Sequence, residues 1–340
     1  MISPLADEKL RVAVIGVGAI GRNHARVYNE IEMADLVAVS DNDPATAARV
    51  GGQLHVPHYT DYRELLEREK PDVVTVSVPT TLHHKIALDV IAAGVNLLVE
   101  KPIAATEAEA IEMISAAKAK AVKFTVGHIE RFNPAISELK KRLDAGELGR
   151  VFQIHARRLG PFPARVADVG VVIDLAIHDY DIMRYLTGSE AVRVFAETAR
   201  RIHTGHEDIL SGLVRFQSDV IGVLDINWLT PTKIRELMVT GEKGMFVANY
   251  ITQDLYFYEN DYAHSNWDAL RAISGVSEGA MTRLKIERKE PLRNEIESFL
   301  HAVTENREPA VSGADGLAAL KIVQMIVDAG KDSEVKQASN

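Results

Sequence analysis

Short apolar stretches alternate with longer mixed stretches over the first third of the chain. Each apolar stretch is nearly continuous, as expected of a strand that is buried on both faces. Such strands are predicted at 10–15, 36–40, 73–78, 95–99 and 122–126. Helices are predicted between them, at about 23–30, 44–51, 61–69, 82–93 and 105–121. This alternation favours a parallel sheet with helices on both faces.

The pattern changes near residue 150, where β-rich segments follow one another with turn signals between them. Strands are predicted at 151–158, 192–200, 209–216, 220–228, 234–240 and 245–248. Because few helices separate them, we expect a mostly antiparallel sheet. Helices are predicted at about 174–187, 291–304 and 313–329. The segment 157–165 carries two prolines and a glycine, which indicates a shaped loop rather than a strand.

Composition narrows the class of protein. A length of 340 residues predicts two domains, and 46% hydrophobic with 26% charged residues is typical of a globular protein. The formal net charge of −9 disfavours binding to nucleic acid or to an anionic membrane. The absence of cysteine excludes disulfides, thiolate catalysis and zinc–thiolate sites. Without a signal-peptide core or an 18-residue apolar run, a cytoplasmic protein with no membrane span is expected.

A glycine-rich turn, G-V-G-A-I-G, joins the first predicted strand to the first predicted helix. Gly16 would permit the tight turn, Gly18 the approach of backbone to a pyrophosphate, and Gly21 the close packing of helix on strand. Ala19 and Ile20 complete the turn at the helix N-terminus, whose unpaired N–H groups suit phosphates. The motif alone is weak, but its position between strand and helix is the context that dinucleotide binding requires.

Asp41 ends the second predicted strand, twenty residues beyond Gly21. A carboxylate there can accept hydrogen bonds from the adenosine ribose hydroxyls and would repel a 2′-phosphate. No basic residue follows until Arg49, so we predict NAD rather than NADP as the cofactor. The alternative is a glycine-rich turn followed by a helix-capping aspartate.

The next strand ends indicate where chemistry would occur, since ligands of open parallel sheets gather at the carboxyl ends of strands. The third strand is followed by Pro79 and Thr80, and the fourth by the tripeptide Glu100, Lys101 and Pro102. Lys101 is therefore expected near nicotinamide and substrate, although a solvated lysine fits the sequence equally well. His83 is a candidate neighbour of the cofactor.

The predicted helix at 174–187 contains Asp174 and His178, spaced so that they share one face. A histidine oriented by a carboxylate could take the proton of an alcohol as hydride leaves. On spacing alone, a structural Asp–His pair is the better interpretation. Asp179 and Asp181 lie on other faces and are expected to be solvated or at a domain contact.

Two further segments are expected to bring polar groups toward the edge of the predicted active site. G-H-I-E-R-F-N-P contributes Arg131 and Asn133, and R-R-L-G-P-F-P-A-R contributes Arg158 and Arg165. Arginines beside a pocket could bind a carboxylate or a diphosphate, although most surface arginines are simply solvated or ion-paired. No metal site is expected, because His83 and His84 diverge on a helix and no H-E-x-x-H motif is present.

Taken in this order, the glycine turn, the E-K-P tripeptide, the D-x-x-x-H helix and the C-terminal helices resemble the Gfo/Idh/MocA oxidoreductase family. The resemblance implies a six-stranded Rossmann domain and an α/β domain with an open sheet whose outer face forms homodimers or homotetramers. It also implies that Lys101, Asp174 and His178 are the catalytic set. We expect residues 1–127 to form the Rossmann domain and 128–340 the substrate domain, with the C-terminal helices packed back on the former.

The segments at 127–136, 158–165 and 168–183 are similar to those of family members that oxidise the C3 hydroxyl of UDP-N-acetylglucosamine with NAD. This implies a nucleotide-sugar substrate, with Arg131, Asn133, Arg158 and Arg165 as candidate substrate residues. Two alternatives remain. One is an NAD-dependent inositol or free-sugar dehydrogenase, and the other is a non-catalytic dinucleotide-binding regulator. In some relatives NAD stays bound and 2-oxoglutarate reoxidises it.

Overall fold

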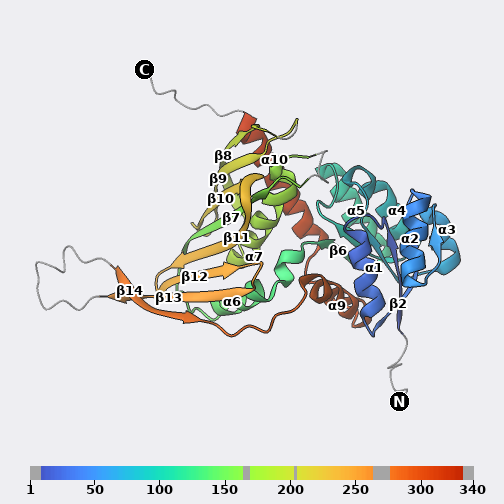
Figure 1. Cartoon of the computed structure of the whole chain (residues 1–340), viewed down its shortest axis with the longest axis horizontal. Helices are drawn as coiled ribbons and strands as arrows, with labels where there is room; N and C mark the ends of the chain where they lie inside the picture. The colour runs from blue at the N-terminus through green and yellow to red at the C-terminus, as the bar shows by residue number, and fades with distance from the viewer. Residues whose placement is uncertain (1–8, 164–168, 203–204, 263–275, 332–340) are drawn as a thin grey trace, which may run out of the picture. The chain divides into compact units, whose positions relative to one another are not determined.

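The structure is a computed structural model that describes residues 9–163, 169–202, 205–262 and 276–331. Its contacts divide the chain into two compact units. Unit 1 comprises Met1–Ile129 with Glu290–Leu320, and unit 2 comprises Glu130–Lys289 with Lys321–Asn340. Figure 1 shows a parallel sheet flanked by helices in the first unit and a larger sheet in the second.

Unit 1 contains a six-stranded sheet in which every pair of neighbours is parallel. Its strands are β1 (Leu10–Ile15), β2 (Ala34–Ser40), β3 (His58–Tyr59), β4 (Val73–Val76), β5 (Asn96–Glu100) and β6 (Phe124–Gly127). The order β3-β2-β1-β4-β5-β6 reverses direction between β1 and β4, as in doubly wound dinucleotide-binding folds. The predicted Rossmann class is therefore confirmed, and the two-residue β3 is the one strand of this sheet that the pattern missed.

Helices cover both faces of this sheet. They are α1 (Gly21–Glu30), α2 (Pro44–Leu54), α3 (Tyr62–Glu69), α4 (His83–Ala92), α5 (Glu107–Lys120) and α9 (Pro291–Thr304), with a 3₁₀ turn η1 (Thr80–Leu82). The core cluster joins β1 and α1 to Leu292, Ile296, Phe299 and Leu300 of α9. Helix α9, which lies near the other end of the sequence, thus helps to bury the first strand.

Side chains fix where two of these helices begin. Asp43 accepts hydrogen bonds from the N–H groups of Ala45 and Thr46 and so caps α2. Thr106 accepts from the N–H of Glu109, whose carboxylate accepts from Thr106 in return, which forms a capping box on α5. Both pairings are local in sequence, which explains why the predicted starts lie within two residues of the observed ones.

Unit 2 contains an eight-stranded sheet ordered β14-β13-β12-β11-β7-β10-β9-β8. Its strands are β7 (Val151–Pro161), β8 (Ala191–Ala199), β9 (Ile209–Phe216), β10 (Ile221–Asn227), β11 (Leu229–Gly241), β12 (Gly244–Asn249), β13 (Asp254–Tyr262) and β14 (Val276–Arg283). All neighbours are antiparallel except β7 and β10. The predicted mostly antiparallel sheet is confirmed, and β13 and β14 extend it beyond the predicted strands.

The prediction of a loop over 157–165 is wrong for its first part. β7 continues to Pro161, and Arg158 and Leu159 pair with Arg235 and Ile234 of β11. Pro161 lies at the strand end, opposite Leu229, where its missing N–H interrupts little of the ladder. Residues 162 and 163 are irregular, and the rest of the segment, including Arg165, lies outside the described residues.

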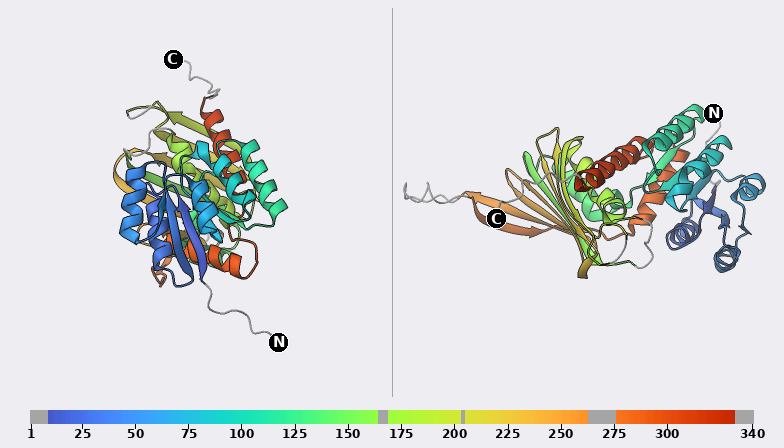
Figure 2. Two further views of the ribbon diagram at one scale, coloured as in Figure 1. Left: turned by 90° about the vertical axis from the view of Figure 1, so that its right-hand side faces the viewer. Right: turned by 90° about the horizontal axis from the view of Figure 1, so that it is seen from above.

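Helices lie along one face of the second sheet (Figure 2). They include α6 (Pro134–Asp144), which the pattern missed, and α7 (Ile177–Thr187), which continues a π-helical turn η3 (Val172–Ala176). A side chain at Gly222 of β10 would collide with Met183, so α7 packs directly on the bare backbone there. On the opposite face Phe195 and Leu213 form a cross-strand pair and are 59% and 47% exposed. The last helix, α10 (Gly313–Lys331), begins in unit 1 and ends in unit 2.

Candidate active site

The glycine turn between β1 and α1 has the geometry that the motif predicts. Gly16 adopts φ +83°, and a side chain there would collide with the backbone of Ser77. A side chain at Gly21 would collide with the carbonyl oxygen of Gly16. Both positions are therefore restricted to glycine by conformation or by close packing. The turn holds α1 tightly against the ends of β1 and β4.

Gly18 differs from the other two glycines, since no atom lies within 4 Å of the place where its side chain would be. The following residues, Ala19 and Ile20, are exposed, and Ile20 makes no side-chain cap on α1. Space beside Gly18 and uncapped N–H groups at the helix start are what a pyrophosphate needs. The residues of this turn therefore fit a dinucleotide.

A cavity of about 500 Å³ opens beside this turn, within unit 1. Gly16, Gly18, Asp41 and Pro79 line it, while Thr80 follows in η1. Asp41 Oδ2 accepts a hydrogen bond from the Val17 N–H at 2.9 Å, and Oδ1 accepts from the Asp43 N–H at 3.0 Å. The carboxylate is thus fixed at the end of β2 with its remaining lone pairs available to ribose hydroxyls.

His83 is buried at the start of α4 rather than exposed to a ligand, with 1% of its surface accessible. Its ring nitrogens lie 2.9 Å from the carbonyl oxygens of Pro102 and Val78. Burial lowers the pKa of His83 despite these carbonyls, so the ring is neutral at pH 7 and donates to one of them at a time. His83 therefore joins the segment after β4 to the segment after β5, where Lys101 lies.

Glu100 fixes the backbone of Lys101 from the other side. Its Oε2 accepts a hydrogen bond from the Lys101 N–H at 3.2 Å, and its Oε1 lies 2.7 Å from His24 Nε2 on α1. Burial raises the pKa of Glu100, but the hydrogen bond and charge of His24 together with Lys101 hold it below its ordinary value. An ionised carboxylate therefore positions Lys101, and the Lys101–Pro102 peptide that follows is cis.

A buried carboxyl, that of Glu295, interacts electrostatically with Glu100. Glu295 of α9 is 2% exposed, and neither of its oxygens has a hydrogen-bond partner among the described residues. Burial, with a smaller contribution from the charge of Glu100, raises the pKa of Glu295 well above its ordinary value. The pKa values of Glu295 and Glu100 are therefore shifted in opposite directions. Neither Glu295 nor His24 was identified from the sequence, because their partners lie far along the chain.

In unit 2, Asp174 lies in the π-helical turn η3 and His178 in the first turn of α7. The helix therefore starts two residues before the predicted position, with wider winding at Asp174. π-Helical turns are frequently found at functional sites. Asp174 is 8% exposed and His178 is partly buried, so both are shielded from bulk solvent.

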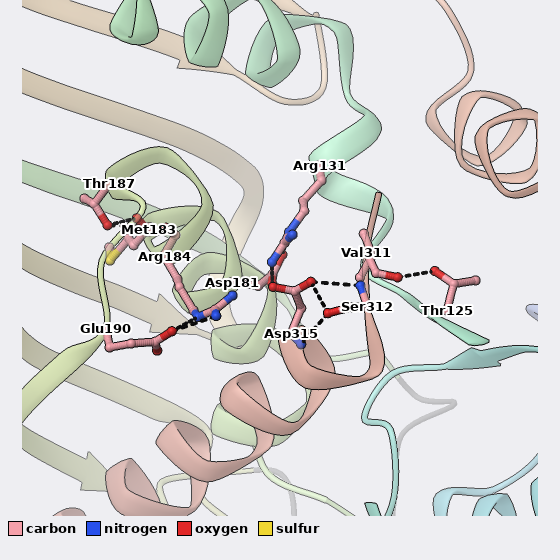
Figure 3. Close-up of polar contacts among 10 residues, drawn as sticks. All are labelled: Thr125, Arg131, Asp181, Met183, Arg184, Thr187, Glu190, Val311, Ser312 and Asp315. Atoms are coloured by element: carbon pink, nitrogen blue, oxygen red, sulfur yellow. Dashed lines mark hydrogen bonds and ion pairs between the residues drawn. The ribbon is translucent and has the colours of Figure 1, made fainter. Parts of the chain in front are cut away.

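Arg131 and Arg158, expected to bind substrate, are instead paired with carboxylates of α7. Figure 3 shows Arg131 facing Asp181, which accepts its Nε–H at 2.7 Å and its Nη2–H at 2.6 Å. Arg158 makes the equivalent pair with Asp179, at 2.7 Å and 3.0 Å, and donates to Glu130 at 2.9 Å. These guanidinium groups are already neutralised, which favours a structural role for both.

The expectation that Asp179 and Asp181 are solvated is wrong, since they are 0% and 1% exposed. They attach α7 to β7 and to the η2 turn, Ile129–Phe132, and so fix the helix that carries His178. Asn133 is also structural. Its side-chain oxygen caps α6 at the Ala135 N–H, and its amide donates to the Tyr250 carbonyl at 3.0 Å.

Arg235 of β11 was not identified, although the alternation of its predicted strand gave a signal. It lies two positions before the buried Leu237 and so projects from the helix-covered face of the sheet. It is the cross-strand neighbour of Arg158. A partly buried positive side chain on the helix-covered face of a sheet is unusual without a role.

The described ranges contain neither a metal-binding cluster of side chains nor a membrane-spanning helix. Within them no group of three or more histidine, aspartate or glutamate side chains is arranged to hold a metal ion. None of the helices in those ranges combines the length and apolar character needed to cross a bilayer.

Comparisons with known proteins agree with this geometry. The family model described as an oxidoreductase family with an NAD-binding Rossmann fold matches residues 10–128, and the GFO/IDH/MocA C-terminal domain model matches residues 136–247. A UDP-N-acetylglucosamine 3-dehydrogenase from Acidithiobacillus ferrooxidans is 30% identical over 94% of this chain and 98% of that protein. A myo-inositol 2-dehydrogenase from Thermotoga maritima is 28% identical over 92% of this chain and 93% of that protein.

The solved structure of the Acidithiobacillus ferrooxidans enzyme has a TM-score of 0.84 to this chain at 27% identity, covering 94% of this chain and 97% of that one. The matches extend through both units, so they bear on the fold of the whole chain. With the glycine turn, the ordered strand ends and these matches together, the chain belongs to the Gfo/Idh/MocA family of NAD-binding oxidoreductases.

Proposed function

We propose that this protein oxidises the C3 hydroxyl of UDP-N-acetylglucosamine to a 3-keto sugar with NAD. The observation that carries the proposal is the retention of Lys101, Asp174 and His178 in a chain that is similar almost end to end to an enzyme of that name. A regulator derived from this fold could lose all three residues without losing cofactor binding. Their retention therefore supports catalysis.

NAD supplies the hydride acceptor when it is bound. Gly16, Gly18 and Gly21 admit the pyrophosphate, and the N–H groups at the start of α1 bind its oxygens. Asp41 binds the adenosine ribose and disfavours a 2′-phosphate. These residues position the cofactor and favour NAD over NADP, but they take no part in the transfer of the proton.

In the proposed mechanism His178 removes the proton of the C3 hydroxyl while a hydride leaves the C3 carbon, for which NAD would be the acceptor. Asp174 orients the imidazole and stabilises its positive charge after the transfer. Lys101 hydrogen-bonds the same oxygen and stabilises the negative charge that develops on it. An exchange of these two roles between Lys101 and His178 gives the same overall reaction. Glu100 and His83 hold the backbone on either side of Lys101 and so limit its movement.

An inositol or free-sugar dehydrogenase is the second candidate, since myo-inositol and scyllo-inositol dehydrogenases are also relatives of similar identity. The two candidates share fold, cofactor and catalytic set. They differ in the part of the substrate beyond the reacting carbon, because an inositol carries no charge and a nucleotide sugar carries a diphosphate. A discriminating experiment must therefore compare charged and uncharged substrates directly.

The purified protein with NAD should be incubated with UDP-N-acetylglucosamine, myo-inositol, scyllo-inositol and glucose, each with and without 2-oxoglutarate. We expect mass spectrometry to detect a nucleotide sugar two mass units lighter than the substrate, from loss of two hydrogens. Product that forms only with 2-oxoglutarate would indicate that NAD is reoxidised in place. Faster oxidation of an inositol than of the nucleotide sugar would contradict the proposal, and reduction of no NAD across the panel would favour the regulator.

A further inference from the structure

Arg235 projects from β11 on the face of the second sheet that α7 covers. Its cross-strand neighbour on β7 is Arg158, so two guanidinium groups stand side by side. Like charges in directly opposed positions destabilise a sheet unless other groups compensate them. Arg158 is compensated by Asp179 and Glu130.

Arg235 has no comparable counterion. Its Nη1 donates to the carbonyl oxygens of Leu159 at 2.6 Å and Ile234 at 2.9 Å. No ion pair joins Arg235 to a carboxylate within the described part of the chain, whereas Arg131 and Arg158 each hold one in two-point geometry. Two carbonyl contacts fix the guanidinium group in place without neutralising its charge.

The electrostatic surroundings agree with this geometry. Burial and the neighbouring charge of Arg158 lower the pKa of Arg235 to about 10, while Asp179, Glu130 and Asp174 act in the opposite direction. Burying a cation costs free energy unless a counterion compensates its charge. Here the nearby carboxylates compensate the charge of Arg235 only in part. Asp174, on the helix that carries His178, is close enough to contribute to this balance.

The strand next to the guanidinium group carries a glycine. The neighbouring position on β7 is Gly160, where a side chain would come within 3.8 Å of Nη1 and 3.9 Å of the second nitrogen, Nη2. Bare backbone therefore lies beside the guanidinium group. No hydrogen bond from Nη2 or Nε of Arg235 is found among the described residues, so these donors can serve a planar oxyanion.

We propose that Arg235 binds an oxyanion of the substrate, which in the proposed reaction is the diphosphate of the nucleotide sugar. This inference rests on the proposed function and names the residue through which a charged substrate would be preferred to a free polyol. A carboxylate of a sugar acid has the same chemistry and is the other possible source of the oxyanion. Arg131 and Arg158 then act as structural neighbours that fix α7 and β7.

The test is equilibrium binding by calorimetry to the protein loaded with NADH. The probes are UDP, inorganic diphosphate and glucuronate. The variants are Arg235→Gln, Arg235→Lys and the control Arg157→Gln. Arg157 is adjacent to Arg158 but lies on the other face of the sheet, where it pairs with Glu236 at 3.3 Å. Thermal denaturation checks that each variant is folded, and NADH titration checks that the cofactor site is intact.

For Arg235→Gln we expect the Kd of UDP to rise about tenfold to a hundredfold, as for the loss of a charge-assisted hydrogen bond. The Kd of UDP for Arg235→Lys should lie between those of wild type and Arg235→Gln, because lysine keeps the positive charge but lacks the planar guanidinium group. The Kd of UDP for the control Arg157→Gln should equal that of wild type, and the Kd of NADH should be the same for every variant. Equal loss in Arg157→Gln, or unchanged affinity for every bound anion in Arg235→Gln, would overturn the inference.

The probes separate this inference from the proposed function. If the wild-type protein binds glucuronate but not UDP, and Arg235→Gln abolishes that binding, Arg235 is an oxyanion residue and the nucleotide-sugar substrate is wrong. If the wild-type protein binds none of the three anions, the inference on Arg235 fails, whatever the reaction. If UDP binds and the Arg235 variants weaken it, both are supported.

Discussion

The pKa values of two glutamates of the first unit are shifted in opposite directions, and the difference follows from their partners. Glu100 shares a hydrogen bond with His24 and accepts another from the Lys101 backbone, so it stays ionised. Neither oxygen of Glu295 has a hydrogen-bond partner among the described residues, and burial raises its pKa well above the ordinary value. A neutral carboxyl near an ionised one avoids repulsion between two buried charges. The state of Glu295 therefore bears on how firmly Glu100 holds Lys101.

Glu295→Gln should gain stability relative to wild type as the pH rises. In the unfolded chain the carboxyl ionises near its ordinary value of 4.5, whereas in the folded protein it stays protonated to higher pH. Between those two values the unfolded state binds fewer protons, so wild-type stability falls by about 1.4 kcal/mol per pH unit. The glutamine cannot ionise and lacks this loss.

Urea denaturation at intervals from pH 4 to pH 8 measures the effect as the difference in the free energy of unfolding between variant and wild type. We expect this difference to increase with pH. The matched control is Glu297→Gln, a partly exposed position of α9 beside Arg293, for which the difference should stay nearly constant. A pH-independent difference for Glu295→Gln would show that Glu295 is ionised in the folded protein.

Among the elements, those held together by local contacts were predictable from the sequence. The β1–turn–α1 unit follows from three glycines and two neighbouring patterns. The extension of β7 beyond Arg158 to Pro161 was not predictable, because a proline and a glycine outweigh alternation in so short a segment. The pairing of Arg158 with Asp179 also escaped prediction. No sequence pattern links partners 21 positions apart, or 76 apart for His24 and Glu100.

Two alanine substitutions in the glycine turn should separate stability from cofactor binding. Gly18→Ala meets no atom within 4 Å, so we expect the free energy of unfolding to change by less than about 0.5 kcal/mol. Its side chain would occupy the space where the pyrophosphate approaches, so the Kd of NAD should rise about tenfold or more. Gly21→Ala would collide with the Gly16 carbonyl and should cost about 1–3 kcal/mol.

Thermal denaturation and NAD titration of both variants provide the measurement. A Gly18→Ala protein that binds NAD as tightly as wild type would place the pyrophosphate away from this turn. A Gly21→Ala protein of unchanged stability would contradict the close packing of α1.

At the scale of the whole molecule, the described helices of the second unit lie along one face of its sheet, and the opposite face has none of them. Phe195 and Leu213 are exposed there as cross-strand neighbours, with Val223 next to Leu213 on the adjoining strand. Contiguous exposed apolar side chains on a sheet often mark an interface. We propose that this face joins copies of the chain into a homodimer or homotetramer. Because each copy carries a net charge of −9, copies of the chain repel one another, and self-association needs apolar contact of this kind.

Leu213→Asp should dissociate the proposed assembly, because it places a charge at the centre of the apolar face. Size-exclusion chromatography with light scattering should give the mass of a monomer for this variant and a multiple of 37.4 kDa for wild type. Ile111→Asp is the control, since Ile111 is 48% exposed on α5 of the first unit. A variant with the wild-type mass, or a monomeric wild type, would exclude this face as the interface.

The claim that Lys101 and His178 carry out the hydroxyl chemistry is tested most directly by single-turnover formation of NADH in Lys101→Met and His178→Gln. Lys118→Met and His84→Gln, changes of the same kind on α5 and α4, are the controls. We predict that the rate falls about 10²- to 10⁴-fold in each test variant while NAD and substrate still bind, and that the controls match wild type. Near wild-type turnover in either test variant, with binding intact, would contradict the assignment.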